Sequence, residues 1–107
     1  MTDVCVVLCT VPEDRARPLV DALLHERLIA CANFVGPVVS RYVWEGAVEE
    51  ARETLLVLKA AVVRVEVLRQ RILDLHPYEV PEILELPVAG GHPPYLRWVL
   101  ESCASGP

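Results

Sequence analysis

Continuous apolar runs alternate along the chain with segments whose apolar residues recur at helical spacing, which predicts alternating strands and helices. Val4–Leu8 is entirely apolar before Cys9 and Thr10, and it predicts a strand buried on both faces. A helix opens at residues 12–14, and its apolar stripe comprises Leu19, Val20, Leu23, Leu24 and Leu28. Because Pro18 would break a helix interior, we expect regular helix to begin only around residues 15–17.

Residues 29–63 predict a long β-hairpin. The first arm contains Ile29–Phe34 and Val38–Trp44, which Gly36-Pro37 separates, and the returning arm runs from Val48 to Val63 with its strand core at Thr54–Lys59. Gly46 supplies the turn between the two arms. The polar residues 49–53 are also compatible with a helical turn, but we favour a strand.

The rest of the chain predicts a helix, a strand and a short terminal helix. Arg64–Leu75 has apolar residues on one face and is terminated by Pro77. Pro81–Val88 is the fourth strand, with its two flanking prolines placed at its ends. Pro93-Pro94 begins the last helix, which bears Leu96, Val99, Leu100 and Cys103, and we expect residues 105–107 to be frayed.

The predicted order, β-α-β-β-α-β plus a terminal helix, indicates an α+β fold of the ferredoxin-like, split β-α-β type. The 107 residues suit a single domain, 1–107, which needs no metal or disulfide to fold. Two helices can cover only one face of the sheet, yet Val4–Leu8 and Leu55–Leu58 are apolar on both faces. The uncovered face should therefore meet other subunits.

Composition supports an oligomer and excludes two classes of partner. Hydrophobic residues make up 53% of the chain, but no apolar run approaches the roughly 18 residues of a membrane span. The net charge is −5, with no cluster of Lys and Arg, so neither a membrane nor a nucleic acid is expected as a partner. With no visible signal peptide and no CxxC spacing, the four cysteines predict reduced thiols and a cytoplasmic protein.

The segment His76–Glu82 concentrates candidate chemistry, because it holds a histidine, a tyrosine and two carboxylates between two stiffening prolines. Imidazole and carboxylates suit Cu(II) or Zn(II), and a thiol at the end of a strand, such as Cys9, suits Cu(I). We therefore predict a joint metal site of Cys9, His76 and Glu82. Alternatively, Cys9 packs in the core, His76 caps the helix before it, and Glu82 pairs with a basic residue.

Two further sets of residues are candidates for binding. Lys59, Tyr78 and Glu79 form a predicted ligand pocket for a small anion, unless Lys59 simply pairs with Glu79 or Glu82. Large aromatic residues carry much of the energy of interfaces, so we assign Tyr42, Trp44 and Trp98 to the contact between subunits. Ser40 and Ser102 have no local base, so no catalytic residue is predicted and the chain is not expected to be an enzyme.

The chain resembles the CutA family of divalent-cation tolerance proteins. The blocks that carry the resemblance run in order along the chain: Val7–Thr10, Leu28–Asn33, Ser40–Gly46, Glu53–Lys59, His76–Glu82 and Tyr95–Trp98. The resemblance implies a ferredoxin-like subunit in a tight homotrimer, with structural kinship to PII-type signalling proteins. It also implies a role in copper tolerance, by binding a divalent cation and sensing it, with no shared enzymatic reaction.

The alternative that this resemblance leaves open is a PII-like signalling or scaffold module. Such a module would bind a small ligand or a protein partner in clefts between subunits, and any metal binding would be incidental. Two positions depart from the family pattern: Ala60 follows Lys59 where many members carry a hydroxyl residue, and Leu75 replaces a histidine that some bacterial members carry. The second departure removes a candidate metal ligand next to His76 of the predicted metal site.

Overall fold

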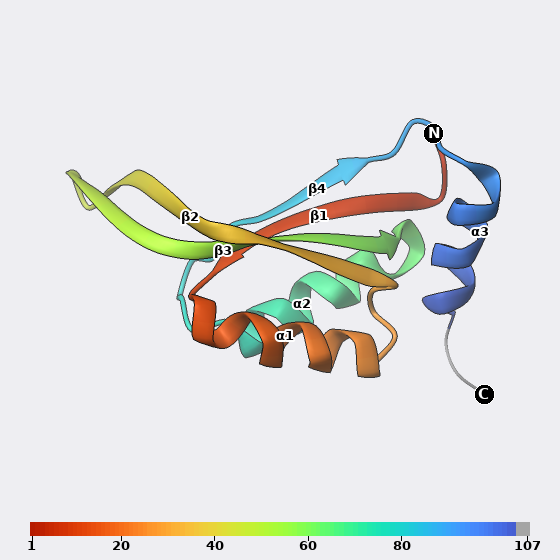
Figure 1. Cartoon of the computed structure of the whole chain (residues 1–107), viewed down its shortest axis with the longest axis horizontal. Coiled ribbons are helices and arrows are strands. Elements are labelled where there is room, and N and C mark those ends of the chain that lie inside the picture. Colours follow the sequence, from red (N-terminus) through yellow and green to blue (C-terminus); the bar gives the residue numbers. More distant parts are fainter. Residues whose placement is uncertain (105–107) are drawn as a thin grey trace.

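The structure, a computed structural model, describes residues 1–104 as a sheet with three helices (Figure 1). The strands are β1 (Val4–Val11), β2 (Cys31–Trp44), β3 (Ala47–Ala61) and β4 (Ile83–Pro87). The helices are α1 (Glu13–His25), α2 (Val65–Leu75), which a short turn at Val62–Arg64 precedes, and α3 (Pro93–Ser102). The order of elements is the predicted one. Residues 105–107, which were expected to be frayed, lie outside the described range.

The sheet has the order β2-β3-β1-β4, and every neighbouring pair of strands is antiparallel. β1 is central, and its register places Cys9 opposite Leu56 of β3 and Ile83 of β4. Because side chains alternate along a strand, this row faces one side of the sheet, whereas Leu8 with Val57 and Leu84 faces the other. The pairing of β1 thus assigns two distinct faces to the sheet.

Helices α1 and α2 lie together against one face of the sheet, which we call the helix face (Figure 1). Every second residue of β1 is buried beneath them, and so are the facing residues of β3 and the apolar stripes of both helices. The fully buried members of this core include Leu23, Leu56, Leu58, Leu68 and Ile72. A smaller core of Val4, Ala61, Val99 and Cys103 holds α3 at one end of the sheet.

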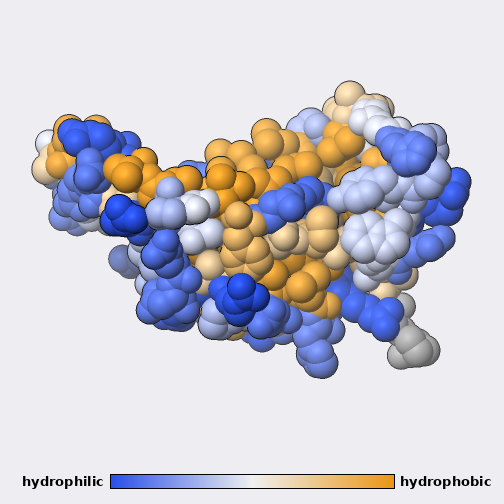
Figure 2. All heavy atoms as spheres, in the orientation of Figure 1, coloured by the Kyte–Doolittle hydropathy of each residue, from blue (hydrophilic) through white to orange (hydrophobic). Residues whose placement is uncertain are grey.

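α3 packs against only one end of the opposite side of the sheet, at Val4 and Ala61, and no described helix covers the rest of this side, which we call the open face. Its apolar residues stay partly accessible: Val35, Leu84 and Leu86 are all more than two-fifths exposed. Hydrophobic atoms accordingly gather over the strands in Figure 2. The two-sided apolar pattern of β1 and β3 is confirmed, and none of the described helices is long and apolar enough to cross a membrane.

The β2–β3 hairpin projects well beyond β1 and β4 (Figure 1). Its tip is a two-residue turn, Glu45-Gly46, and both residues have positive φ, as a type I′ turn requires. Between Val35 and Val38 the register shifts, so that Gly36 and Pro37 together oppose Thr54. A side chain at Gly36 would press against the β3 backbone, because a Cβ there would lie 3.3 Å from the carbonyl oxygen of Glu53.

Several predicted boundaries were wrong. α1 begins at Glu13 and contains Pro18 in its interior, because Pro18 is exposed and the carbonyl that it leaves unpaired can bind water. β1 continues through Val11, and β2 is one strand that the bulge bends but does not break. β4 begins at Ile83, two residues after Pro81. The strand favoured for residues 49–53 is confirmed.

Replacing Leu58 with alanine should lower the free energy of unfolding by about 2–5 kcal/mol, because the side chain is fully buried and its removal leaves a cavity. The matched control is Val63→Ala, since Val63 is 88% exposed and its truncation should change stability little. Urea unfolding at one protein concentration measures both variants. Equal losses in the two would contradict this placement of the core.

Candidate functional site

The segment 76–82 leads from the end of α2 to β4 and is fixed to β1 by His76. Nε2 of this buried ring donates to the carbonyl oxygen of Thr10 at 2.8 Å, and Nδ1 accepts from the backbone N–H of Tyr78 at 3.1 Å. A backbone N–H can only donate, so the proton of the ring resides on Nε2. Both nitrogens therefore have protein partners, and a metal ion would have to displace one of them.

The alternative that His76 caps α2 is met by its backbone, because His76 is the C-cap residue and its N–H donates to the carbonyl oxygen of Ile72 at 2.8 Å. The ring bonds to β1 instead, because the chain turns into extended geometry at His76 and carries the side chain away from the helix axis. The Leu75 carbonyl at the end of α2 accepts a hydrogen bond from Nη2 of Arg15 at 3.4 Å. A side chain from α1 thus caps α2.

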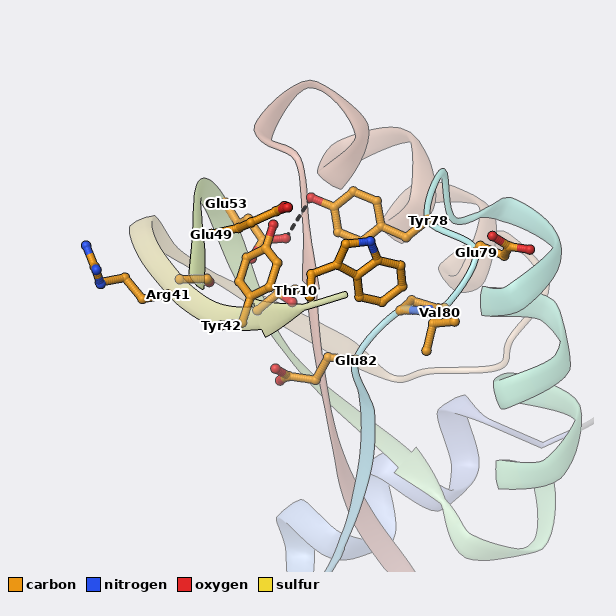
Figure 3. Close-up of a pocket in the computed structure, with 12 residues that line it drawn as sticks. Thr10, Arg41, Tyr42, Glu49, Glu53, Tyr78, Glu79, Val80 and Glu82 are labelled. Carbon is orange, nitrogen blue, oxygen red and sulfur yellow. Dashed lines mark hydrogen bonds between the residues drawn. The ribbon is translucent and has the colours of Figure 1, made fainter. Parts of the chain in front are cut away.

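Tyr78 connects the same segment to β3. Its hydroxyl donates to Oε2 of Glu53 at 2.8 Å (Figure 3), and Glu53 is only 3% exposed. Burial, together with the hydrogen bond to this carboxylate, raises the pKa of Tyr78 to about 12. The hydroxyl therefore keeps its proton near neutral pH and remains the donor.

Cys9 is completely buried in the core on the helix face, and its thiol donates weakly to the Thr10 carbonyl oxygen at 3.7 Å. Burial raises the pKa of Cys9 to about 12, and the negative charges of Glu82 and Glu53 add to the effect. At neutral pH the residue is a thiol, and a soft metal would have to release its proton in order to bind. This environment is the one expected for a cysteine that packs in the core.

A cavity of about 720 Å³ lies on the open face, between the outer half of the hairpin and the segment 78–82 (Figure 3). It is open to solvent on one side and framed by both strands of the hairpin, the end of β1 and the segment that leads into β4. Its lining residues are aromatic, carboxylic or small: chiefly Thr10, Ser40, Tyr42, Trp44, Glu49, Glu53, Tyr78, Val80 and Glu82.

The charged side chains at this cavity differ in direction. Glu49 and Glu53 point toward Tyr78 in Figure 3, whereas Arg41 and Glu79 point away on opposite sides. The Arg41 guanidinium forms an ion pair with Glu50 at 2.9 Å on the other side of the hairpin. The interior of the cavity is consequently lined by carboxylates and aromatic rings.

Cys9, His76 and Glu82 meet at the same end of β1 but do not converge on one point. Cys9 faces the helices, His76 bonds to the carbonyl of Thr10, and Glu82 lines the cavity on the open face. Within residues 1–104, no three side chains among His, Cys, Asp and Glu are grouped so that they could hold a metal ion. In this conformation, the predicted set lies on two sides of the sheet.

The predicted ligand pocket is divided as well. Tyr78 and Glu79 line the cavity, but Lys59 lies toward the opposite end of β3, where its ammonium donates to the Asn33 side chain. Among the described residues, Lys59 does not pair with Glu79 or Glu82. The cavity lies at the Thr10 end of β1, where Leu55 of β3 is opposite Thr10, and Lys59 is four residues farther along β3. Four residues of strand span about 13 Å.

The three aromatic residues assigned to an interface occupy two places. Tyr42 and Trp44 belong to the hairpin and line the cavity, whereas Trp98 is on α3, with its ring centroid 5.7 Å from that of Tyr95. All three are about two-fifths exposed.

The sequence prediction missed Glu49 and Glu53, which the cavity shares with Thr10. The signal that could have found them is the alternation of side chains between the two faces of a strand. Once residues 49–53 are a strand, Glu49, Glu53 and Leu55 fall on one face, and pairing with Thr10 turns that face to the open side.

Comparisons with known proteins assign the chain to a family. The family model for the CutA1 divalent ion tolerance protein matches residues 5–102. The divalent-cation tolerance protein CutA of Thermus thermophilus is 47% identical over 98 residues, which cover 91% of this chain and 95% of that protein. The chain therefore belongs to the CutA divalent-cation tolerance family.

Solved structures agree with this assignment. CutA of Xylella fastidiosa superimposes with a TM-score of 0.93 at 34% identity, covering 96% of this chain and 100% of the other. A protein of Archaeoglobus fulgidus, described as a periplasmic divalent cation tolerance protein CutA, has a TM-score of 0.91 at 27% identity, with coverage of 94% and 99%. The relatives from Thermus thermophilus and Archaeoglobus fulgidus are named for divalent-cation tolerance, and none of the three is named for an enzymatic activity.

Replacing Tyr78 with phenylalanine should lower the free energy of unfolding by about 1–3 kcal/mol, because Glu53 loses its hydroxyl donor while remaining buried. The folded-state pKa of Tyr78 lies above the usual value of 10, so this tyrosine contributes stability below pH 10 that is lost as the pH rises toward 12. Unfolding measured from pH 8 to 12 should show a shallower alkaline loss in the variant. Tyr42→Phe is the control, and an identical alkaline loss in Tyr78→Phe and the parent protein would contradict the assignment.

Proposed function

We propose that the chain acts in divalent-cation tolerance as a binding protein that senses a cation and catalyses no reaction. The observation that carries the proposal is the match to the family over residues 5–102, which spans every strand and helix described above except Val4, the first residue of β1. The acidic cavity on the open face is compatible with a role in handling cations.

We propose further that the working form is a homotrimer of ferredoxin-like subunits. The strand order β2-β3-β1-β4, with two helices on one face, is the arrangement typical of that fold. The open face supports assembly, because partly accessible Val35, Leu84 and Leu86 would gain by burial against another subunit. The projecting hairpin, with Tyr42 and Trp44, offers a second contact.

The proposed cation is copper or another divalent metal ion, bound by Cys9, His76 and Glu82. The support is proximity: His76 bonds to the residue next to Cys9, and Glu82 is close enough to raise the pKa of the Cys9 thiol. Binding would require the thiol proton to leave and the His76 ring to give up one hydrogen bond. Folding needs no metal in this proposal, because the core is apolar.

A second candidate is a PII-like signalling or scaffold module that binds a small ligand or a protein partner between subunits. The cavity favours it, because 720 Å³ is a typical volume for a small-molecule site. Lys59 would then belong to a separate cleft from Tyr78 and Glu79.

We place the protein in the cytoplasm, with neither nucleic acid nor membrane as partner, on the grounds of its acidic charge and unpaired cysteines. The Archaeoglobus fulgidus relative is described as periplasmic, so the location is a property to be measured in each member.

Replacing Trp44 with alanine should shift the assembly toward smaller species, because a large, partly exposed aromatic side chain on the hairpin is lost from the proposed interface. Analytical ultracentrifugation over a dilution series measures the shift. Val63→Ala, an exposed change away from the hairpin, should leave sedimentation unaltered. An undiminished trimer in Trp44→Ala would exclude this residue from the contact.

Cys9→Ser and His76→Ala should each weaken copper binding at least about tenfold if the thiol and the imidazole are ligands. Untagged protein is titrated with Cu(I), Cu(II) and Zn(II), and binding is measured by competition with a chelator. His92→Ala is the matched control, since His92 lies in the loop before α3. Copper affinities that match the parent in both test variants would remove these residues from any metal site.

A further inference from the structure

The open face carries its charged side chains at two opposite ends. Lys59, the single lysine of the chain, is opposite Val6 of β1 and lies near the end that α3 covers. Glu49 and Glu82 lie at the other end, where they line the cavity. The rows between these ends are apolar and include Leu84, which is 52% exposed. The open face is therefore basic at one end and acidic at the other.

These opposite charges are too far apart to pair within one subunit. Six residues of β3 separate Lys59 from Glu53, which borders the cavity, and six residues of a strand span about 20 Å. The Lys59 ammonium donates to the Asn33 side chain instead. The ion pairs within residues 1–104 involve neither this lysine nor Glu49 and Glu82. Each end thus presents charge that this part of the chain does not compensate.

Assembly makes this separation of charges costly unless the two ends meet. When the open face is buried against other subunits, as proposed above, Lys59 and the cavity carboxylates lose contact with water. Removing a charge from water is unfavourable unless an opposite charge takes the place of the water. The opposite charge for each end lies on the same face, but only a second subunit can bring it within reach.

The cavity is also suited in shape and chemistry to a lysine side chain from another subunit. It is open on one side, and its hairpin wall projects beyond β1 and β4 (Figures 1 and 3). Tyr42 and Trp44 line this wall, and aromatic rings pack against the methylene groups of a lysine and attract its ammonium. A volume of about 720 Å³ accommodates this side chain together with apolar neighbours from the same open face.

We propose that the cavity of each subunit receives Lys59 of the next subunit, where its ammonium pairs with Glu49 and Glu82. The proposal rests on the homotrimer proposed above and specifies the contact that holds it together. This contact is heterologous, because a subunit offers Lys59 at one end and its cavity at the other, and contacts of this kind close into a ring. Lys59 and Tyr78, which lie apart in one subunit, come together between two.

The single lysine allows a direct test by cross-linking the full chain with a carbodiimide. This reagent joins an amine to a carboxylate only where the two groups are in contact, so Lys59 cannot be linked to the cavity of its own subunit. Denaturing electrophoresis should show covalent dimers and trimers, and mass spectrometry should identify amides that join Lys59 to Glu49 or Glu82. The control, Lys59→Arg, keeps the charge but removes the amine, so it should lose these products and sediment like the parent protein.

Exchanging the charges tests the same pairing without a reagent. Lys59→Glu should weaken association at least about tenfold in a dilution series followed by sedimentation, because like charges then meet in the cavity. Adding Glu49→Lys and Glu82→Lys to this variant restores opposite charges at every contact and should recover most of the lost association. Glu49 and Glu82 are exposed in the single subunit, so these changes do not disturb its core.

The outcomes separate this pairing from the trimer itself. A protein that sediments as a trimer but yields no amide between Lys59 and Glu49 or Glu82 would overturn the pairing and leave the trimer standing. The same holds if the exchange of charges recovers no association. Covalent products that stop at the dimer would overturn the ring in favour of a two-fold contact, and a monomeric parent protein would overturn both proposals.

Discussion

The alternation of side chains along β1 is the constraint on which the rest of this fold depends. β1 pairs on both sides, so its register decides which residues of β3 and β4 share a face with Cys9 and which share a face with Thr10. One face receives α1 and α2 and becomes the core. The other is covered by α3 only at the end that holds Val4 and Ala61, and the rest keeps apolar residues that are available for assembly.

The junction after α2 joins these two faces. Both ring nitrogens of His76 form hydrogen bonds with the backbone, and Tyr78 bonds to Glu53 on the open face. The segment between them is thereby attached to β1 and β3 before β4 begins. The rigid segment positions one wall of the cavity. This role accounts for the polar side chains of a proline-rich stretch that contributes little to the apolar core.

The architecture was predictable because it rests on local periodicity. Apolar runs identified β1 and the inner half of β3, and helical stripes identified α1 and α2, since burial imposes those patterns directly on the sequence. Convergence of side chains was less predictable. Cys9 and Glu82 are close in space but on different faces. Lys59 lies near the end of β3, whereas Tyr78, in the segment before β4, bonds to Glu53 farther along that strand. Such relations follow from strand register, which no local pattern encodes. Pro18 shows a case in which a local rule was too strict. A proline inside a helix costs free energy, but Pro18 is exposed to water, which reduced that cost and let α1 continue through it.

The bulge at Gly36-Pro37 has a consequence for the outer hairpin as a whole. On the inner side of the bulge the odd-numbered residues of β2, such as Asn33 and Val35, pair with the open-face residues of β3; beyond it the even-numbered residues, including Tyr42 and Trp44, take that position. The extra residue thus reverses which residues of β2 face each side of the sheet beyond the bulge. Loss of one residue at the bulge would turn Arg41 and Val43 to the open face and turn Tyr42 and Trp44 away from it, with no substitution in the outer hairpin. One insertion or deletion at this point of β2 would therefore exchange the side chains that the outer hairpin presents on its two faces, with no substitution elsewhere.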